Sequence, residues 1–333
     1  MKHHDEPFYR RIISDAWHIA WHHKHLWVFG FFATLIGFGA VTNPLFNASD
    51  RVFEKLPMLM GGQGAYAFPG LATFRAVMLA SPFPLLAFVV ALLVLSLFCG
   101  VFAWMTYVSV GAIISSVRKI ERGGDPHFAD EVKAGTQTFW PVLGVNLFTQ
   151  LFLYAMFMLV ASSLRMFMTD GSVWRGLFYV GTFMAFTLLA VGASIAAVYA
   201  SCEVVAKGRS MRAALETGAS LAWRHWLLSF ELAVTLMVSV IAVGIATIIV
   251  ALIGSVPFIF MIFVAAALKI PAVSAMVVVT ALVVMVGLIV VAGSFLTAFQ
   301  AAAWTLMWSS IESKKHAPPK LVRLARKHLP FLA

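Results

Sequence analysis

The sequence predicts an all-α membrane protein, a six-span helix bundle built of three parallel repeats. Three observations support this prediction: long segments without a charged residue, a bias of Lys and Arg toward one side of those segments, and a thirteen-residue pattern that occurs three times. Only 11% of the 333 residues are charged, against roughly a quarter in a typical soluble domain. Membrane insertion is therefore favoured over a soluble helical fold.

The uncharged segments are long enough to cross a membrane, because about 20 apolar residues cover a hydrocarbon core of roughly 30 Å. Four stretches hold no Lys, Arg, Asp or Glu: 82–117, 139–164, 176–201 and 270–311. The second and sixth predicted spans exceed a perpendicular crossing, so we expect them to tilt, kink or project beyond the bilayer. The six predicted spans are His25–Asn43, Phe83–Val117, Trp140–Leu164, Gly176–Ala206, Trp226–Gly254 and Val273–Ile311.

The distribution of basic residues predicts which way the spans face. Eighteen of the 24 Lys and Arg residues fall on the side that carries both termini, and six fall on the other. Because cytoplasmic loops carry the excess of Lys and Arg, both termini are expected in the cytoplasm. The net charge of +10 then reflects topology and not nucleic-acid binding. We expect a multi-pass protein of the bacterial inner (cytoplasmic) membrane.

An internal repeat is the most informative pattern in the chain. The segments Tyr9–Trp21, Phe128–Trp140 and Met211–Trp223 align without a gap, and each ends in Trp. Steps of four and seven along a segment mark one face of a helix, so each is expected to form an amphipathic helix along the cytoplasmic interface. The alternative is a chance alignment of three Trp residues at membrane boundaries. The shared positions are a branched aliphatic residue four places on (Ile13, Val132, Leu215) and a small residue at seven (Ala16, Gly135, Gly218).

The repeats define the predicted domain organisation. Residues 1–312 form one transmembrane domain of three parallel units, about 1–122, 123–208 and 209–312, and a basic cytoplasmic tail follows at 313–333. Of the outer connections, Pro44–Pro82 is long and is predicted to rest on the outer leaflet. Ser255–Pro271 is too short to span and is flanked by prolines, so an interfacial or re-entrant segment is predicted there.

The segment that begins Asp15-AWHIAWHHKHLWVFGFF, with the later Gly208-RSMRAALETGASLAWRHWLL, resembles a broad family of uncharacterised bacterial polytopic membrane proteins. These are similar to the membrane module ahead of the catalytic domain in some glycerophosphodiester phosphodiesterases. The resemblance covers most of the chain in layout and implies an integral membrane helix bundle. It implies no catalytic barrel, because no soluble segment here exceeds about forty residues, and it supplies no functional residues.

Histidines near the N-terminus offer one candidate site. His18 and His22 stand four residues apart, near His23 and His25, and this spacing allows two ligands on one helical face. No cysteine accompanies them, so interfacial histidines that bond lipid headgroups are the favoured interpretation and no metal is predicted. Cys99 and Cys202 fall inside or at the end of spans, which supports neither a disulfide nor a zinc site.

Polar residues inside the spans offer the other candidate site. They are predicted to form a layer in the cytoplasmic half of the bundle, either as a substrate or proton pathway or as bonding between helices. Pairing of Glu203 with Lys207, and of Glu231 with Arg224, is favoured as the simpler explanation. The residues of this layer are Asn146, Gln150, Glu203, Glu231 and Gln300.

Two ladders of small residues predict close helix packing. They are Gly192, Ala196 and Ala200 in the fourth span and Gly293, Thr297 and Ala301 in the sixth.

The predicted function is a non-enzymatic integral membrane protein, a lipid-associated or scaffolding helix bundle without cofactors. Searches for zinc-protease, serine-hydrolase and phosphate-loop motifs find none in the sequence, so an intramembrane enzyme is a distant third possibility. The alternative is a small transporter or lipid-translocating protein that uses the polar layer. The expected partners are membrane lipids, anionic at the cytoplasmic face, and no nucleic acid; a membrane-protein partner stays unidentified.

Overall fold

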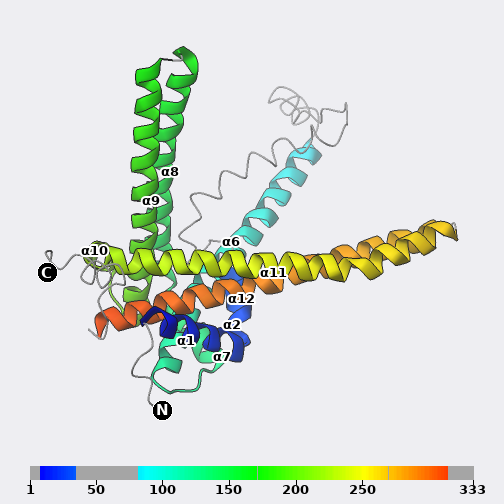
Figure 1. Cartoon of the computed structure of the whole chain (residues 1–333), viewed down its shortest axis with the longest axis horizontal. Coiled ribbons are helices and arrows are strands. Elements are labelled where there is room, and N and C mark those ends of the chain that lie inside the picture. Colours follow the sequence, from blue (N-terminus) through cyan, green and yellow to red (C-terminus); the bar gives the residue numbers. More distant parts are fainter. Residues whose placement is uncertain (1–7, 35–81, 171, 269, 314–333) are drawn as a thin grey trace, which may run out of the picture. The chain divides into compact units, whose positions relative to one another are not determined.

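A computed structural model of the chain describes residues 8–34, 82–170, 172–268 and 270–313 (Figure 1). Most of these residues are helical, and none of them forms a strand. The helices are α1 (Phe8–His22), α2 (His25–Thr34), α6 (Pro82–Glu121), α7 (Phe128–Gln137), α8 (Phe139–Asp170), α9 (Val173–Lys207), α10 (Met211–Arg224), α11 (Trp226–Ala267) and α12 (Pro271–Glu312).

Five of the described helices are long and apolar enough to cross a membrane: α6, α8, α9, α11 and α12. They identify the chain as a multi-pass integral membrane protein. The first predicted span, His25–Asn43, begins as the short apolar helix α2, and its residues after Thr34 lie outside the described residues. The connection Pro44–Pro82, apart from its last residue, and the tail beyond Ser313 also lie outside them.

The prediction for Ser255–Pro271 is wrong. α11 continues without a break from Trp226 to Ala267, with Pro257 inside it, and α12 begins at Pro271. Proline removes one backbone hydrogen bond, but membrane helices tolerate it because local adjustments satisfy the freed carbonyl. Pro271 alone acts as a boundary, at the first helical position where its missing N–H costs nothing. Each of these 42-residue helices is about 63 Å long at 1.5 Å per residue.

The described chain divides into two compact units. One comprises 43–105, and its described part is the first portion of α6, where large apolar side chains such as Leu93 and Leu97 are exposed. The other comprises 1–42 and 106–333 and holds the main core. Its largest buried side chains are Trp304, Trp308 and Phe299 of α12 and Tyr199 of α9.

α12 is the central helix of this second unit, in contact with α1, α2, α9 and α11. Phe295 of α12 lies edge-on to three indoles, those of Trp17, Trp21 and Trp27, with ring centroids 4.9, 5.8 and 5.6 Å away. The Trp27 indole also donates a 2.7 Å hydrogen bond to the Ala20 carbonyl. We call the region where α1 and α2 meet α12, α7 meets α6 and α10 meets α9 the packed end.

The first and third repeated segments lie within α1 and α10, while the second forms α7 and ends in the first turn of α8. The shared faces of α1, α7 and α10 are turned toward protein. The small residue at the seventh step (Ala16, Gly135 or Gly218) is buried in each case. A Cβ at Gly135 would lie 2.2 Å from the Val108 carbonyl oxygen of α6, and one at Gly218 would lie 2.6 Å from the Ala196 carbonyl oxygen of α9. These close backbone approaches require glycine. The apolar faces are therefore covered by helices and not by lipid.

The tryptophans that end the repeated segments keep most of their surface uncovered, although Trp21 also contacts Phe295. Trp21, Trp140 and Trp223 are 53%, 76% and 85% exposed. Indoles favour the headgroup level because the ring is apolar while its N–H seeks a partner. These tryptophans are thus left largely uncovered by the protein, while the apolar face of each amphipathic helix packs on the core.

The predicted ladders of small residues are right only in part. A Cβ at Gly192 or Gly293 would meet nothing within 4 Å, so neither glycine marks a close approach. Ala196 and Ala200, further along the first ladder, are the residues whose backbones meet Gly218. In the second ladder, Thr297 shares a 2.8 Å hydroxyl–hydroxyl hydrogen bond with Thr34 of α2. Close contact between helices is therefore concentrated at the packed end, whereas Gly192 and Gly293 face open space.

We predict that Gly135→Ala and Gly218→Ala destabilise the protein by about 1–3 kcal/mol each, the usual cost of overpacking. The matched control is Gly192→Ala, which meets open space and is expected to be neutral or slightly stabilising because Ala favours helix. Midpoints of unfolding in a denaturing detergent measure the effect. Equal midpoints for all three variants would contradict the close approaches.

Candidate functional site

The candidate site is built on the last turn of α9. Glu203 and Lys207 stand one helical turn apart, and Gly208 then ends the helix in the left-handed conformation at φ 64°. The Gly208 N–H donates to the Val204 carbonyl, as in common helix C-termini where glycine pays no Cβ penalty. The chain reverses there, and the next residue, Arg209, returns to the Glu203 carboxylate.

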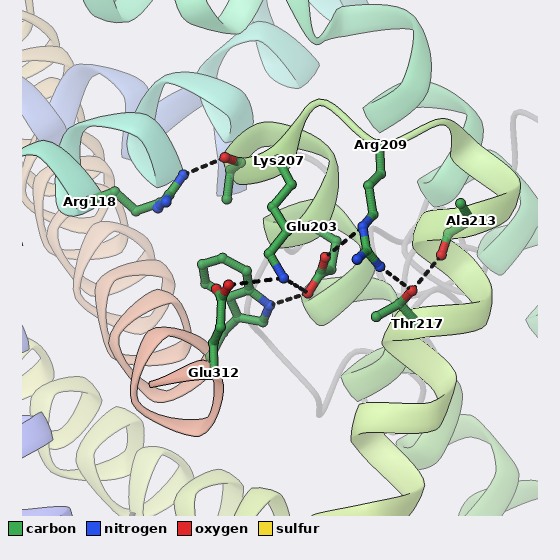
Figure 2. A network of polar contacts seen from close by, with 9 residues as sticks. Arg118, Glu203, Lys207, Arg209, Ala213, Thr217 and Glu312 are labelled. Atoms are coloured by element: carbon green, nitrogen blue, oxygen red, sulfur yellow. Dashed lines mark hydrogen bonds and ion pairs between the residues drawn. The ribbon is translucent and has the colours of Figure 1, made fainter. Parts of the chain in front are cut away.

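Glu203 is a buried carboxylate, with an exposed fraction of 1%. Its Oε1 accepts hydrogen bonds from the Trp308 indole Nε1 and from Lys207 Nζ, both at 3.1 Å (Figure 2). Arg209 Nε lies 3.4 Å from Oε2 as an ion pair. The contact between Arg209 Nε and Oε2 does not have hydrogen-bond geometry. Oε2 is therefore buried without a hydrogen bond.

The cations around Glu203 connect it to other helices. Lys207 Nζ also lies 3.0 Å from Oε1 of Glu312, at the end of α12. Arg118 of α6 donates a 2.7 Å hydrogen bond to the Ala206 carbonyl, at the end of α9. The Arg209 guanidinium donates to the Thr217 hydroxyl of α10 at 2.6 Å. Figure 2 shows these contacts meeting between the four helices.

The buried ring of Trp308 is the second centre of this arrangement. The Arg118 guanidinium carbon and Lys207 Nζ each lie 5.4 Å from its ring centroid. Cations at this range are attracted to the electron-rich face of an indole. We call Arg118, Glu203, Lys207, Arg209, Trp308 and Glu312 the Glu203 cluster. Three cations face two carboxylates, so the cluster carries one excess positive charge.

Sequence reasoning found part of this cluster. The predicted pair of Glu203 with Lys207 is confirmed. Arg118 and Trp308 were missed because they come from α6 and α12, far from Glu203 in sequence. Arg209 could have been predicted from Gly208. A glycine directly after a helix indicates that the chain reverses there, which brings the next residue back toward the end of that helix.

A second buried carboxylate, Glu131, was not predicted as a site residue. It is 2% exposed on α7, and its Oε1 accepts a 3.1 Å hydrogen bond from His25 Nε2 at the start of α2. Its Oε2 is buried without a hydrogen bond. The repeated pattern could have revealed Glu131 as unusual. At the same step of the other two segments stand Ile12 and Ala214, which are apolar and buried.

The other members of the predicted polar layer lie outside the Glu203 cluster. Asn146 is half-buried and donates to the Val142 carbonyl of its own helix at 2.9 Å. Gln150, one turn later, is exposed. Gln300 is buried in α12, and Glu231 is half-buried in α11.

The histidines of α1 pack on one another. The rings of His18 and His22 stack with centroids 3.8 Å apart, and His22 Nδ1 donates to the His18 carbonyl at 3.0 Å. Burial and the neighbouring His25 lower the pKa of His23. Within the part of the chain that the structure describes, no three His, Cys, Asp or Glu side chains gather as a metal site. Cys99 is exposed and Cys202 is buried.

Comparison with protein-family models, with curated proteins and with solved structures gives no match to this chain. The resemblance to the membrane module of phosphodiesterases therefore stays a prediction from sequence. The site has to be interpreted from its own geometry.

We predict that Glu203→Ala destabilises the protein by about 2–4 kcal/mol. It leaves the Trp308 N–H without its acceptor and removes one carboxylate from Lys207 and from Arg209. The effect falls below that of a fully buried pair because both cations keep other partners and access to water. Glu203→Gln, which keeps an acceptor for Trp308, should cost less. Unfolding midpoints in the same detergent measure both.

The matched control for this prediction is Asp15→Ala, which removes the exposed Arg11–Asp15 pair at 3.7 Å. An exposed pair of this kind contributes at most about 0.5 kcal/mol. If Glu203→Ala is no more destabilising than Asp15→Ala, the Glu203 cluster does not hold the helices together.

Proposed function

We propose that this protein is a non-enzymatic, lipid-associated scaffolding helix bundle of the cytoplasmic membrane. The observation that supports this best is the Glu203 cluster. Its charged side chains are engaged with one another and with the ends of α6, α9, α10 and α12. Charges used in this way stabilise one arrangement of helices, which is what a scaffold requires.

The proposed architecture is six spans in three parallel repeats, with α2 as the described start of the first span. The packing order of the amphipathic helices supports it. α7 packs on α6, and α10 packs on α9, so each lies on the last helix of the preceding repeat. α1 packs on α12, the last helix of the third repeat. The same relation thus holds for all three repeats, and α1 closes the series into a ring.

Lipids are the proposed partners, anionic at the cytoplasmic face. Exposed tryptophans at the ends of the repeated segments fit the headgroup level. The bias of Lys and Arg toward the same side supports attraction to anionic lipid, at about 1 kcal/mol or less for each basic residue. Both termini are proposed to be cytoplasmic for the same reason.

The second candidate is a small transporter or lipid-translocating protein. Two buried carboxylate oxygens without a hydrogen bond, on Glu131 and Glu203, favour it. Unsatisfied buried acceptors are rare in proteins, and ionisable groups within membrane domains often mark ion or substrate paths.

Flux through reconstituted liposomes separates the two candidates. For the scaffold we expect lipid and solute flux equal to that of empty liposomes, both for the native chain and for Glu231→Gln. Solute efflux and fluorescent-lipid scrambling measure it. Flux well above empty liposomes that is lost in Glu231→Gln would overturn the scaffold and establish the transporter.

Topology is tested with single cysteines in a Cys99→Ser background, since Cys202 is buried. Asp125→Cys lies in the exposed link between α6 and α7, and Ser172→Cys lies between α8 and α9. In intact spheroplasts, a membrane-impermeant thiol reagent should label Ser172→Cys and reach Asp125→Cys only after lysis. The opposite pattern would invert the proposed orientation.

A further inference from the structure

Glu131 breaks the rule that the other two amphipathic helices follow. At the third step of the repeated segment, α1 holds Ile12 at 6% exposure and α10 holds Ala214 at 0%, while α7 holds Glu131 at 2%. Burial of a carboxylate where an apolar residue would pack is costly. A break in a local rule without a packing gain is the expected sign of a functional position.

We propose that His25 and Glu131 form a proton-binding site that controls the contact between α2 and α7. His25 Nε2 lies 3.1 Å from Glu131 Oε1, and the second carboxylate oxygen is buried without a hydrogen bond. With no proton bound, the pair leaves an uncompensated negative charge in the core. One proton on the pair removes that net charge, whether it sits on the imidazole or on the carboxyl.

The pair is reachable by protons from water. The His25 side chain is 29% exposed, and the centroid of the His23 ring lies 5.8 Å from that of His25. Burial of the His23 ring and the neighbouring His25 lower the pKa of His23, so His23 favours its neutral form.

The other charged groups near the pair lie on its own helices and on α6. Asp130, beside Glu131, is held in an exposed pair with Lys119 of α6 at 3.3 Å. Lys24 precedes His25, and Lys133 follows on α7. His127 stands one turn before Glu131, and its backbone carbonyl accepts the Glu131 N–H at 3.1 Å. The Glu131 carboxylate bonds to His25 through Oε1, and its Oε2 has no hydrogen bond. Asp130 serves as an exposed comparison on the same helix.

The proton affects packing because the pair lies beside the ring contact that joins the same two helices. Phe29 of α2 stacks on Phe128 of α7, with centroids 5.0 Å apart. On its other side α2 is pressed against α12, where a Cβ at Gly30 would lie 2.2 Å from the Ser294 carbonyl oxygen. A net negative charge between α2 and α7 would weaken their contact while leaving the α12 contact in place.

The sign of the effect follows from linkage. Burial disfavours the net negative charge of the unprotonated pair, so we expect the α2–α7 contact to be strongest in acid and to weaken as pH rises. The test spans about pH 5 to 8, the range in which histidine side chains in general change their charge. One bound proton allows at most about a tenfold change in the opening equilibrium for each pH unit.

The test is hydrogen–deuterium exchange of the full chain in lipid nanodiscs, read on α2 and α7 and corrected for the intrinsic pH dependence of exchange. For the native chain we expect opening of these helices to increase about tenfold or more over this range. Glu131→Gln should abolish the increase because it removes the charge. Asp130→Asn, the adjacent control, should retain it.

If Glu131→Gln does not fold, Glu131→Ile replaces it, since Ile is the residue at the same step of α1. It is expected to fold and to show no pH dependence in α2 and α7. The proposal is overturned if the native chain shows no pH dependence of opening, or if either Glu131 variant keeps the native dependence.

Discussion

Burial of the Glu203 carboxylate under Trp308 constrains most of what surrounds it. A charge removed from water is tolerated only when partners surround it, and here they come from different helices. Lys207 reaches it from the same turn, Arg209 from beyond the Gly208 reversal, and the Trp308 indole from α12. Because Lys207 also pairs with Glu312 of α12 and Arg209 also bonds to Thr217 of α10, the Glu203 carboxylate links α9 to both helices.

Such a polar centre matters more in a membrane than in water. Lipid tails are as apolar as the helices, so there is no hydrophobic drive to bring spans together, and packing and hydrogen bonds have to do so. The structure supplies both at the packed end. Gly135 and Gly218 allow backbones to approach closely, and the aromatic rings around Phe295 fill the space between α1, α2 and α12. Beyond this end the long helices expose their apolar side chains.

The apolar faces of the amphipathic helices α1, α7 and α10 are covered by other helices of the protein. Their pattern alone is equally consistent with an apolar face on lipid or on protein. The structure turns those faces inward, at Ala16, Gly135 and Gly218, and leaves the tryptophans outside. This arrangement supports a role for the amphipathic helices in holding the longer helices together. It also isolates Glu131 as the polar exception among three equivalent positions.

The sequence by itself determined the elements that depend on local properties. Hydropathy placed the long helices, as in the predicted Gly176–Ala206 against the observed Val173–Lys207, and one-turn spacing identified the Glu203–Lys207 pair. It failed at Ser255–Pro271, because proline is a reliable boundary only where water competes for backbone hydrogen bonds. Only the tertiary structure decided the partners of the buried carboxylates. Trp308 and His25 lie 105 and 106 residues from Glu203 and Glu131, and such contacts depend on how helices pack, which no local period or charge count encodes.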